Sequence, residues 1–334
     1  MKTYAAYLAK RLLQFVLVVF IGINLTYVIS HATPIDPVEQ TISALTSFGN
    51  TSPEAIETMR ESLRELYGMS GTPVEQYVSF WSRIVVGDFG PSLSAFPTPV
   101  SELILRALPW TIGLLVVATV LAWLLGNLLG GLAGYYRKNR LLKAMGLVAM
   151  GLHPMPYYVV AFVLLVVFGF MWPVLPISGG SGIGVGRGFS FDFVYSVFLH
   201  SLLPALSLVL VGLGGWFLGM RALVSNIVTE DYVVYAELGG VDRRRILGSY
   251  VMRNALVPQV TGLAMSLGAI FTGAIITEEV FGYPGIGSLL VDAVHAGDYS
   301  LVLGITSVSI VAVSLAVLVI DLLYPLLDPR VQVE

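Results

Sequence analysis

Gly179-Gly180-Ser181-Gly182 forms a G-x-S-G sequence, the pattern in this chain that comes nearest to covalent catalysis. A serine becomes a nucleophile when a histidine lies close enough to take its proton. Ser181, however, lies in a Gly-rich stretch that is followed by Arg187 and Asp192, and His295 also falls in a polar stretch. We therefore interpret residues 173–190 as a connecting loop and expect no catalytic residue in it.

Other reactive patterns are missing from the sequence. It contains no G-x-x-x-x-G-K-[ST] sequence for a nucleotide and no H-E-x-x-H sequence for zinc. It also contains no cysteine, which excludes disulfides and thiolate chemistry. His153 and His200 stand alone in or near apolar segments, and we expect both to be hydrogen-bonded within helix packing rather than to bind a metal. The sequence thus predicts neither an enzyme nor a cofactor site.

A charged segment interrupts the apolar chain between residues 231 and 258. We predict that a first helix runs from about Thr229 to Leu238 and ends at Gly239-Gly240, because glycine readily adopts the left-handed conformation that ends many helices. Asp242 is placed to accept hydrogen bonds from the first free amides of a second helix. The arginines of the charged segment could serve only to orient the chain in a membrane. The pattern of two helices around a Gly corner instead favours a surface that a partner binds.

The composition requires a lipid solvent. Of the 334 residues, 56% are hydrophobic and 12% are charged, and the mean hydropathy is +0.83, which excludes an ordinary soluble domain. A helix needs about 20 apolar residues to cross the hydrocarbon core. Six uncharged stretches meet this need: Leu12–Ser30 and those between Arg106 and Arg137, Lys143 and Arg187, Asp192 and Arg221, Arg253 and Glu278, and Asp298 and Asp321. We predict an all-α membrane protein with six transmembrane helices.

Two details of these stretches matter for the prediction. A cleaved signal peptide is the alternative for Leu12–Ser30, but this stretch is longer than the usual apolar core of about 7–15 residues. Gly126, Gly130 and Gly134 recur every four residues in the second span, and Gly215 and Gly219 repeat the spacing later. Small residues let helices approach closely in lipid, so we expect helix contacts at these glycines.

Residues 31–107 form the one sizeable polar part between predicted spans. Ser52-Pro53-Glu54 predicts a helix with a serine N-cap and a proline in its first turn. Thr72-Pro73-Val74-Glu75 predicts a capping box for a second helix, and Thr98-Pro99 predicts a third, short helix. We expect these helices to pack on one another and on the membrane surface.

Lysine and arginine predict the orientation. If the N-terminus is cytoplasmic, the inside segments hold thirteen of the eighteen: Lys2, Lys10, Arg11, Arg137, Lys138, Arg140, Lys143, Arg221, Arg243, Arg244, Arg245, Arg253 and Arg330. The outside segments hold the other five: Arg60, Arg64, Arg83, Arg106 and Arg187. This imbalance agrees with the positive-inside rule. Both termini and the charged segment are therefore expected in the cytoplasm.

The charged segment resembles the cytoplasmic "EAA" loop of ABC importer permeases of the dipeptide/oligopeptide type, which reads A-x-A-x-G and later N-A-L-[IL]-P. Ala236–Gly240 and Asn254–Pro258 occupy these places. Leu238 and Gly239 depart from the family's small and basic residues. The resemblance implies that this coupling loop, residues 225–258, binds an ATPase.

Three further stretches resemble the same family, and together the similarity runs from about Lys10 to Asp321. Pro34–Pro37 is similar to its P-G-D-P turn, with isoleucine in place of glycine, and Gly87–Ser92 is similar to its G-D-[FL]-G-x-S sequence. Residues 278–299 are similar to its V-E-T-[IV]-F-x-x-P-G-[LI]-G-x-L-L-x-D-A-[IV]-x-x-x-D-Y sequence, with Glu279 in place of threonine.

The resemblance implies two sets of site residues. Those expected to couple to the ATPase are Ala236, Glu237, Leu238, Gly239, Gly240, Asp242 and Arg243. Those expected at an extracytoplasmic gate or binding-protein contact are Glu278, Phe281, Pro284, Gly285, Gly287 and Asp292. The implied organisation is an N-terminal segment with the first span (1–30), an extracytoplasmic helical insertion (31–107), and a five-helix permease core (108–334) whose coupling loop joins spans four and five.

The implied function is that of a permease subunit in the inner membrane of a prokaryotic cell, forming half of a pathway for peptides or similar small solutes. Its implied partners are a second permease, usually a different chain, two cytoplasmic ATPases that carry the ATP and Mg, and an extracytoplasmic binding protein. The chain itself would bind no cofactor and no nucleic acid.

Two other classes remain open from the sequence. An ATP-independent channel or a secondary transporter would need no ATPase, but ion-coupled transporters usually keep ionisable residues inside their spans. No such residue falls deep within the predicted spans. A rhomboid-like intramembrane protease would need Ser181 to begin a membrane helix.

Overall fold

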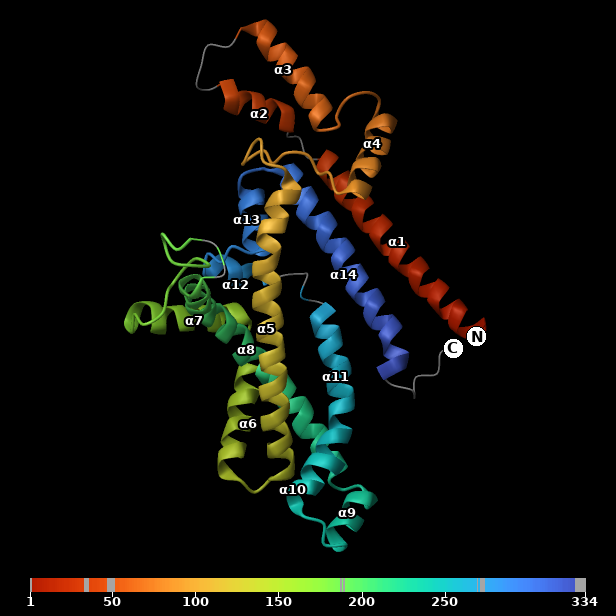
Figure 1. Cartoon of the computed structure of the whole chain (residues 1–334), viewed down its shortest axis with the longest axis vertical. Helices are drawn as coiled ribbons and strands as arrows, with labels where there is room; N and C mark the ends of the chain where they lie inside the picture. Colours follow the sequence, from red (N-terminus) through yellow and green to blue (C-terminus); the bar gives the residue numbers. More distant parts are fainter. Residues whose placement is uncertain are drawn as a thin grey trace.

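The computed structural model describes residues 2–32, 36–46, 52–186, 188, 190–268, 270 and 274–327. Within them the chain is helical apart from its turns and loops (Figure 1). Pro34 and Ile35 of the predicted turn lie outside the described residues, as do Arg187 and Arg330 of the charge count. The fold class predicted from the sequence, an all-α membrane protein, agrees with this architecture.

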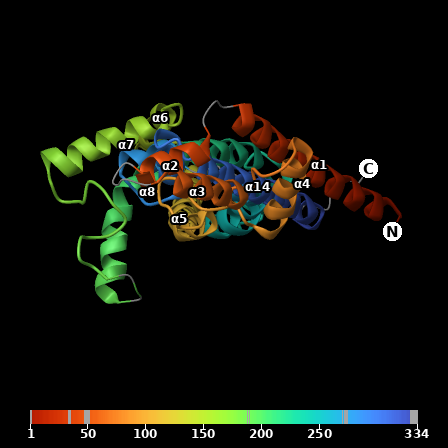
Figure 2. The same cartoon turned by 90° about the horizontal axis from the view of Figure 1, so that it is seen from above.

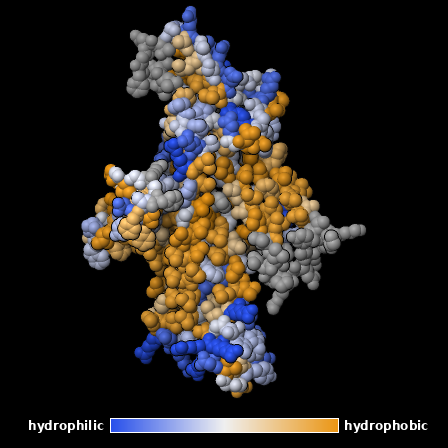
Figure 3. Space-filling model, in the orientation of Figure 1, coloured by the Kyte–Doolittle hydropathy of each residue, from blue (hydrophilic) through white to orange (hydrophobic). Residues whose placement is uncertain are grey.

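Four helices are long and apolar enough to cross a membrane: α1 (Lys2–Ala32), α5 (Val100–Tyr135), α8 (Phe191–Ile227) and α14 (Tyr299–Leu327). A fifth candidate is broken, because α6 (Arg140–Leu152) meets the segment Tyr157–Met171 at an angle of 106°. That segment contains α7 (Tyr157–Leu165) and the π-helical turn η1 (Val166–Met171). Apolar residues form a band between two more polar ends of the molecule (Figure 3). By length and composition the described chain therefore has four or five spans.

Two prolines explain the break between α6 and α7. The sequence between these helices reads His153-Pro154-Met155-Pro156. Proline lacks the amide donor that a continuous helix needs and disfavours helical conformation in the residue before it. Pro156 instead precedes the first residue of α7. After the bend, α7 packs on α8, where Ala161 is buried against Leu203 (Figure 2).

One predicted element is wrong. The helix after Thr98-Pro99 is not a separate short one, because α5 begins at Val100 and continues for 36 residues. Val100, Ile104 and Ala107 recur at helical spacing and are all buried, so the first turns share one packed face with the membrane part. The predicted boundary at residue 107 therefore lies inside this helix.

Glycines allow α5 and α8 to pack in direct backbone contact. A Cβ atom at Gly126 would lie 2.5 Å from the Trp216 Cβ, and one at Gly134 would lie 2.8 Å from the Val224 Cβ. At Gly130 it would collide with the backbone carbonyl oxygen of Phe217. The predicted close contact at this glycine face is confirmed, and α8 is the helix that occupies it.

The polar insertion contains α2 (Pro37–Thr46), α3 (Pro53–Leu66) and α4 (Pro73–Val86). Ser52 caps α3 by accepting from the Ala55 N–H, and both halves of the Thr72–Glu75 capping box are formed at α4, so both predicted starts are confirmed. A small core of Val38, Ile42 and Leu63 joins α2 to α3. These helices lie at the end of α5 opposite to the charged segment (Figure 1).

The remaining helices complete the two ends. At one end are α9 (Asp231–Leu238), the single turn α10 (Arg243–Arg245), the π-helical η2 (Ile246–Met252) and α11 (Arg253–Gly268). At the other are α12 (Ile275–Val280) and α13 (Ile286–His295), which lie between α11 and α14 in the chain. These two ends carry all the site residues predicted from the sequence.

Candidate coupling loop and extracytoplasmic closure

The coupling loop turns between α9 and α10 at Gly240. This residue has φ +74°, a conformation that residues with a Cβ rarely adopt. Two backbone hydrogen bonds close the helix end, from the Gly240 N–H to the Glu237 carbonyl (3.0 Å) and from the Val241 N–H to the Ala236 carbonyl (3.1 Å). Asp242 then accepts from the Arg244 N–H at 3.0 Å. The predicted helix–Gly–helix corner is therefore confirmed, including its N-cap.

One side of the corner is fixed to the membrane helices. Val233 and Ala236 of α9 are buried in a cluster with Ile246 and Val251 of η2 and with Met220 and Val224 of α8. The Met252 sulfur of η2 occupies the space where a Cβ at Gly131 of α5 would lie. A displacement of α9 is therefore transmitted to α5, α8 and α11 through packed side chains.

The other side of the corner is exposed to solvent. Of the residues predicted to couple to an ATPase, Ala236 is the buried anchor, and the exposed ones are Glu237, Leu238, Gly239, Gly240, Asp242 and Arg243. Leu238 is 79% exposed, and Tyr235, which the sequence interpretation missed, is 71% exposed. Tyr235 and Leu238 are thus two large, exposed apolar side chains beside a corner that backbone hydrogen bonds close. Such side chains are typical of a surface that a protein partner covers.

Glu278 organises the opposite end, and it is fully buried (0% exposed). Its Oε1 accepts from the Thr111 hydroxyl of α5 at 2.7 Å, and its Oε2 accepts from the Gly287 N–H at 2.7 Å and the Ser288 N–H at 3.3 Å. The Thr111 Oγ1 in turn accepts from the Ile286 N–H at 2.8 Å. The carboxylate therefore satisfies the free amides at the start of α13 that a cap residue would otherwise satisfy, while it binds α13 to α5.

Two glycines make room for this carboxylate. A Cβ at Gly285 would collide with the Glu278 carboxyl group, and one at Gly287 would lie 2.6 Å from the Ile275 Cα. Neither glycine has a positive φ, so space rather than backbone conformation requires glycine here. Glycine is thus needed at positions 285 and 287 because a side chain there would collide with Glu278 or Ile275.

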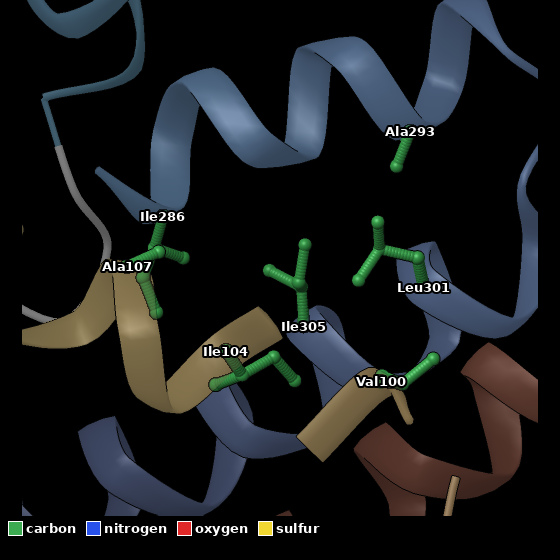
Figure 4. Close-up of a cluster of buried hydrophobic side chains, with 7 residues drawn as sticks. All are labelled: Val100, Ile104, Ala107, Ile286, Ala293, Leu301 and Ile305. Atoms are coloured by element: carbon green, nitrogen blue, oxygen red, sulfur yellow. The ribbon is translucent and has the colours of Figure 1, made fainter. Parts of the chain in front are cut away.

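An apolar cluster completes the attachment of α13 (Figure 4). Ile286 and Ala293 of α13 pack against Val100, Ile104 and Ala107 of α5 and against Leu301 and Ile305 of α14. We call α12, α13 and the turn between them (residues 275–295) the closure segment. It is attached to α5 both by a buried carboxylate and by an apolar face.

A second buried carboxylate, Asp298, lies just after the closure segment. Its Oδ1 accepts from the Leu301 N–H at 3.0 Å and so caps α14. Its Oδ2 accepts from the Ser92 hydroxyl at 2.5 Å and from the N–H and hydroxyl of Ser94, both at 2.9 Å. Two stretches that the sequence interpretation noted separately, around residues 87–92 and 298–299, are therefore in contact.

Asp88 organises the first of these stretches. It accepts from the Gly90 N–H at 2.9 Å and from the Arg83 guanidinium at 3.0 Å. Although burial acts in the opposite direction, these two hydrogen bonds hold the pKa of the Asp88 carboxyl below its ordinary value. Asp88 thus stays ionised and keeps the turn that presents Ser92 to Asp298.

The residues predicted for a gate or binding-protein contact divide by burial. Glu278, Phe281, Gly285 and Gly287 are buried and Pro284 is half-buried, whereas Asp292 is exposed. The buried members hold the closure segment together, and Asp292 is the member that solvent can reach. Thr111 was missed because it lies 167 residues from Glu278 in the chain.

The Gly-rich loop also has a packing role. The Gly179 N–H donates to the Phe281 carbonyl at 2.9 Å, and a Cβ at Gly180 would lie 2.7 Å from Pro284. The loop therefore contacts the closure segment through Gly179 and Gly180, the two residues before Ser181. His200 is hydrogen-bonded to the Ser196 carbonyl at 2.7 Å, as predicted. His153 packs against Gly214 and Gly215 of α8.

Glu278→Gln should lower the thermal stability of the purified chain. An amide donor replaces one acceptor oxygen, so at least one buried N–H or O–H loses its partner, at a cost of about 1–3 kcal/mol. Glu279→Gln is the matched control, because the neighbouring glutamate is exposed. Melting followed by size-exclusion chromatography measures both. Equal melting temperatures for the two variants would show that the buried hydrogen bonds do not hold the closure segment.

Known proteins resemble this chain over nearly its full length. Residues 126–333 match the family described as "binding-protein-dependent transport system inner membrane component". The chain is 28% identical to the oligopeptide transport system permease protein AppB of Bacillus subtilis, over 98% of this chain and 99% of that protein. It is 30% identical to the probable D,D-dipeptide transport system permease protein DdpB of Escherichia coli, over 98% of each chain. The chain therefore belongs to the family of binding-protein-dependent transport system inner membrane components, as a multi-pass transport subunit rather than an enzyme.

Proposed function

We propose that this chain is one of two permease subunits of an ABC importer and forms half of a pathway for peptides or similar small solutes. The observation that carries the proposal is the coupling loop, a rigid corner with one packed side and one exposed apolar side. The relatives over nearly the full length are permeases of peptide transport systems, which supports the substrate class.

The proposed topology has six spans. In addition to α1, α5, the broken pair α6 and α7, α8 and α14, the fifth of the six in chain order is the helical run of α10, η2 and α11 from Arg243 to Gly268. α11 alone has 16 residues, and the preceding π-helical turn extends it toward the roughly 20 residues that a span requires. An even number of spans places both termini on one side, which the distribution of lysine and arginine assigns to the cytoplasm.

Labelling of introduced cysteines tests this orientation, since the chain has none of its own. Ser62→Cys on α3 should react with a membrane-impermeant maleimide in intact cells, because residues 31–107 would lie outside. Lys138→Cys in the turn between α5 and α6 should react only after the cells are opened. Labelling of the Lys138 variant in intact cells, with Ser62 protected, would invert the proposed topology.

The proposed mechanism links the coupling loop to the pathway. Two cytoplasmic ATPases would each bind one permease, and ATP-driven closure would move α9 together with η2. That motion would reach α5 through Met252, which packs on Gly131. It would reach α8 through Met220 and Val224, which belong to that helix and lie in the same cluster as α9. At the far end, the closure segment rests on α5 and α14, so it follows any rotation of these helices.

The other proposed partners are a second, different permease and an extracytoplasmic binding protein. The binding protein would deliver substrate at the end of the molecule that carries α2, α3, α4 and the exposed Asp292. An ATP-independent channel or secondary transporter is less consistent with the structure, because neither needs the exposed surface of Tyr235 and Leu238.

Gly240→Val should uncouple transport without unfolding the chain. Valine at φ +74° strains the backbone by about 1–3 kcal/mol, which is too little to disrupt the membrane helices but enough to move the corner. We expect normal membrane insertion, loss of most substrate uptake, and ATPase subunits that dissociate or no longer respond to substrate. Arg243→Ala should be milder, since Arg244 and Arg245 supply similar charge.

Gly186→Val is the control, because this glycine has open space around it and no positive φ. Insertion, ATPase co-purification and uptake are measured on the same preparations. Normal uptake by the Gly240 variant, with its ATPase still bound, would mean that the corner does not couple the two parts.

A further inference from the structure

The helix α4 packs against the membrane-spanning part of α1 through aromatic side chains. The Trp81 ring stacks on Phe20 with 5.4 Å between centroids, and Tyr27 contacts both Phe80 (4.6 Å) and Tyr77 (5.4 Å). The Tyr77 hydroxyl also donates to the Asn24 side chain at 2.7 Å. These partners on α1 lie within its candidate span, Tyr7–Ile29. Most of α4 is therefore held beside a candidate membrane span.

A second face of α4 is apolar and uncovered. Val74, Val78 and Val85 occupy positions i, i+4 and i+11, which lie on one side of a helix. They are 71%, 62% and 79% exposed. Their side adjoins the one that carries Tyr77, Trp81 and Ile84, so the apolar surface of α4 is wider than α1 covers.

The polar side chains of α4 are engaged elsewhere. Arg83 binds Asp88 and donates to the Leu66 carbonyl at 2.9 Å. Gln76 donates to the Met69 carbonyl at 2.8 Å, and Glu75 serves the capping box. Arg83 and Gln76 thus bind neighbouring parts of the insertion and Glu75 binds the start of its own helix, whereas Val74, Val78 and Val85 are left exposed in the described part of the chain.

The uncovered valines continue an apolar surface that is already assigned to lipid. On α1, beside the aromatic contacts, Ile21, Leu25 and Val28 are exposed, as expected for a span that faces acyl chains. Tyr and Trp side chains are enriched at the boundary between headgroups and acyl chains, and α4 contributes Tyr77 and Trp81 at this place. An amphipathic helix with this arrangement lies in the membrane interface.

We infer that α4 is an interfacial helix whose Val74, Val78 and Val85 contact the acyl chains of the leaflet next to the extracytoplasmic insertion. The lipid bilayer is its occupant, and through Arg83 and Asp88 the helix ties the insertion to the membrane surface. The identity of that leaflet as the outer one rests on the proposed orientation, whereas the lipid contact itself does not.

Lipid-attached quenchers test this inference directly. Val78→Cys and, separately, Val85→Cys are introduced into the full chain, labelled with an environment-sensitive fluorophore and reconstituted in liposomes. Nitroxides on the acyl chain near the headgroup should quench both labels several-fold more than they quench a label at Glu61→Cys, which is exposed on α3. Iodide in the buffer reaches labels in water, so it should quench the label at Glu61→Cys more than the labels at Val78→Cys and Val85→Cys. Leu25→Cys on α1 is the lipid-exposed reference.

Two outcomes would overturn the inference. Strong quenching by iodide and weak quenching by nitroxide lipids would place the valines in water. Protection from both quenchers in the assembled complex would mean that a protein partner covers them. Because the readout needs no substrate or ATP, a complex that fails to transport still gives a valid result, and the two failures are distinguishable.

Discussion

The buried carboxylate of Glu278 is the constraint on which the end of the molecule around the closure segment depends. A carboxylate removed from water must have its hydrogen bonds replaced, and no cation supplies them in the described part of the chain. The donors are instead the Thr111 hydroxyl and two amides at the start of α13. Because the hydroxyl belongs to α5 and both amides belong to α13, the carboxylate of α12 fixes these three helices relative to one another.

Asp298 repeats this solution directly before the first residue of α14. It caps that helix and binds Ser92 and Ser94, so the end of the polar insertion, the closure segment and the last span meet at one point. The insertion is thereby continuous with the membrane part, a conclusion that the unbroken helix α5 also supports. A binding protein that docks on the insertion would thus act on α5 and α14 directly.

The two ends of the molecule communicate through the pairing of α5 with α8. At Gly130 their backbones touch, and packing this close deforms little, so the pair is expected to move as one body. Met252 fills the neighbouring position at Gly131 and joins the coupling loop to the same pair. If a partner moves α9 as proposed, the motion is therefore expected to reach the closure segment through this pair of helices.

Local features could be predicted from the sequence, because their causes lie within a few residues. The caps at Ser52, Thr72 and Asp242 and the left-handed Gly240 each depend on side chains or backbone freedom in one turn of chain. The close approach of another helix at Gly126, Gly130 and Gly134 was also predictable. The identity of that helix, α8, was not.

Long-range contacts could not be predicted in this way. Thr111 on an apolar helix gives no signal that it binds a glutamate 167 residues away, and Ser92 gives none for Asp298. Thr98-Pro99 predicted where a helix starts but not how far it continues, and the charged pair Glu102 and Arg106 lies on the exposed side of α5 without ending it. The break after α6 follows from Pro154 and Pro156. The direction in which the chain continues after these prolines depends on the packing of the flanking helices.

A double-mutant cycle between Thr111 and Glu278 tests the central claim most directly. Thr111→Val and Glu278→Gln each remove part of one hydrogen-bond network, and residues in one network couple by about 0.5–3 kcal/mol. The loss of melting temperature in the double variant should therefore be clearly smaller than the sum of the two single losses, and close to the larger one. Additive losses would contradict the account, because they would show that the two side chains stabilise the closure segment independently.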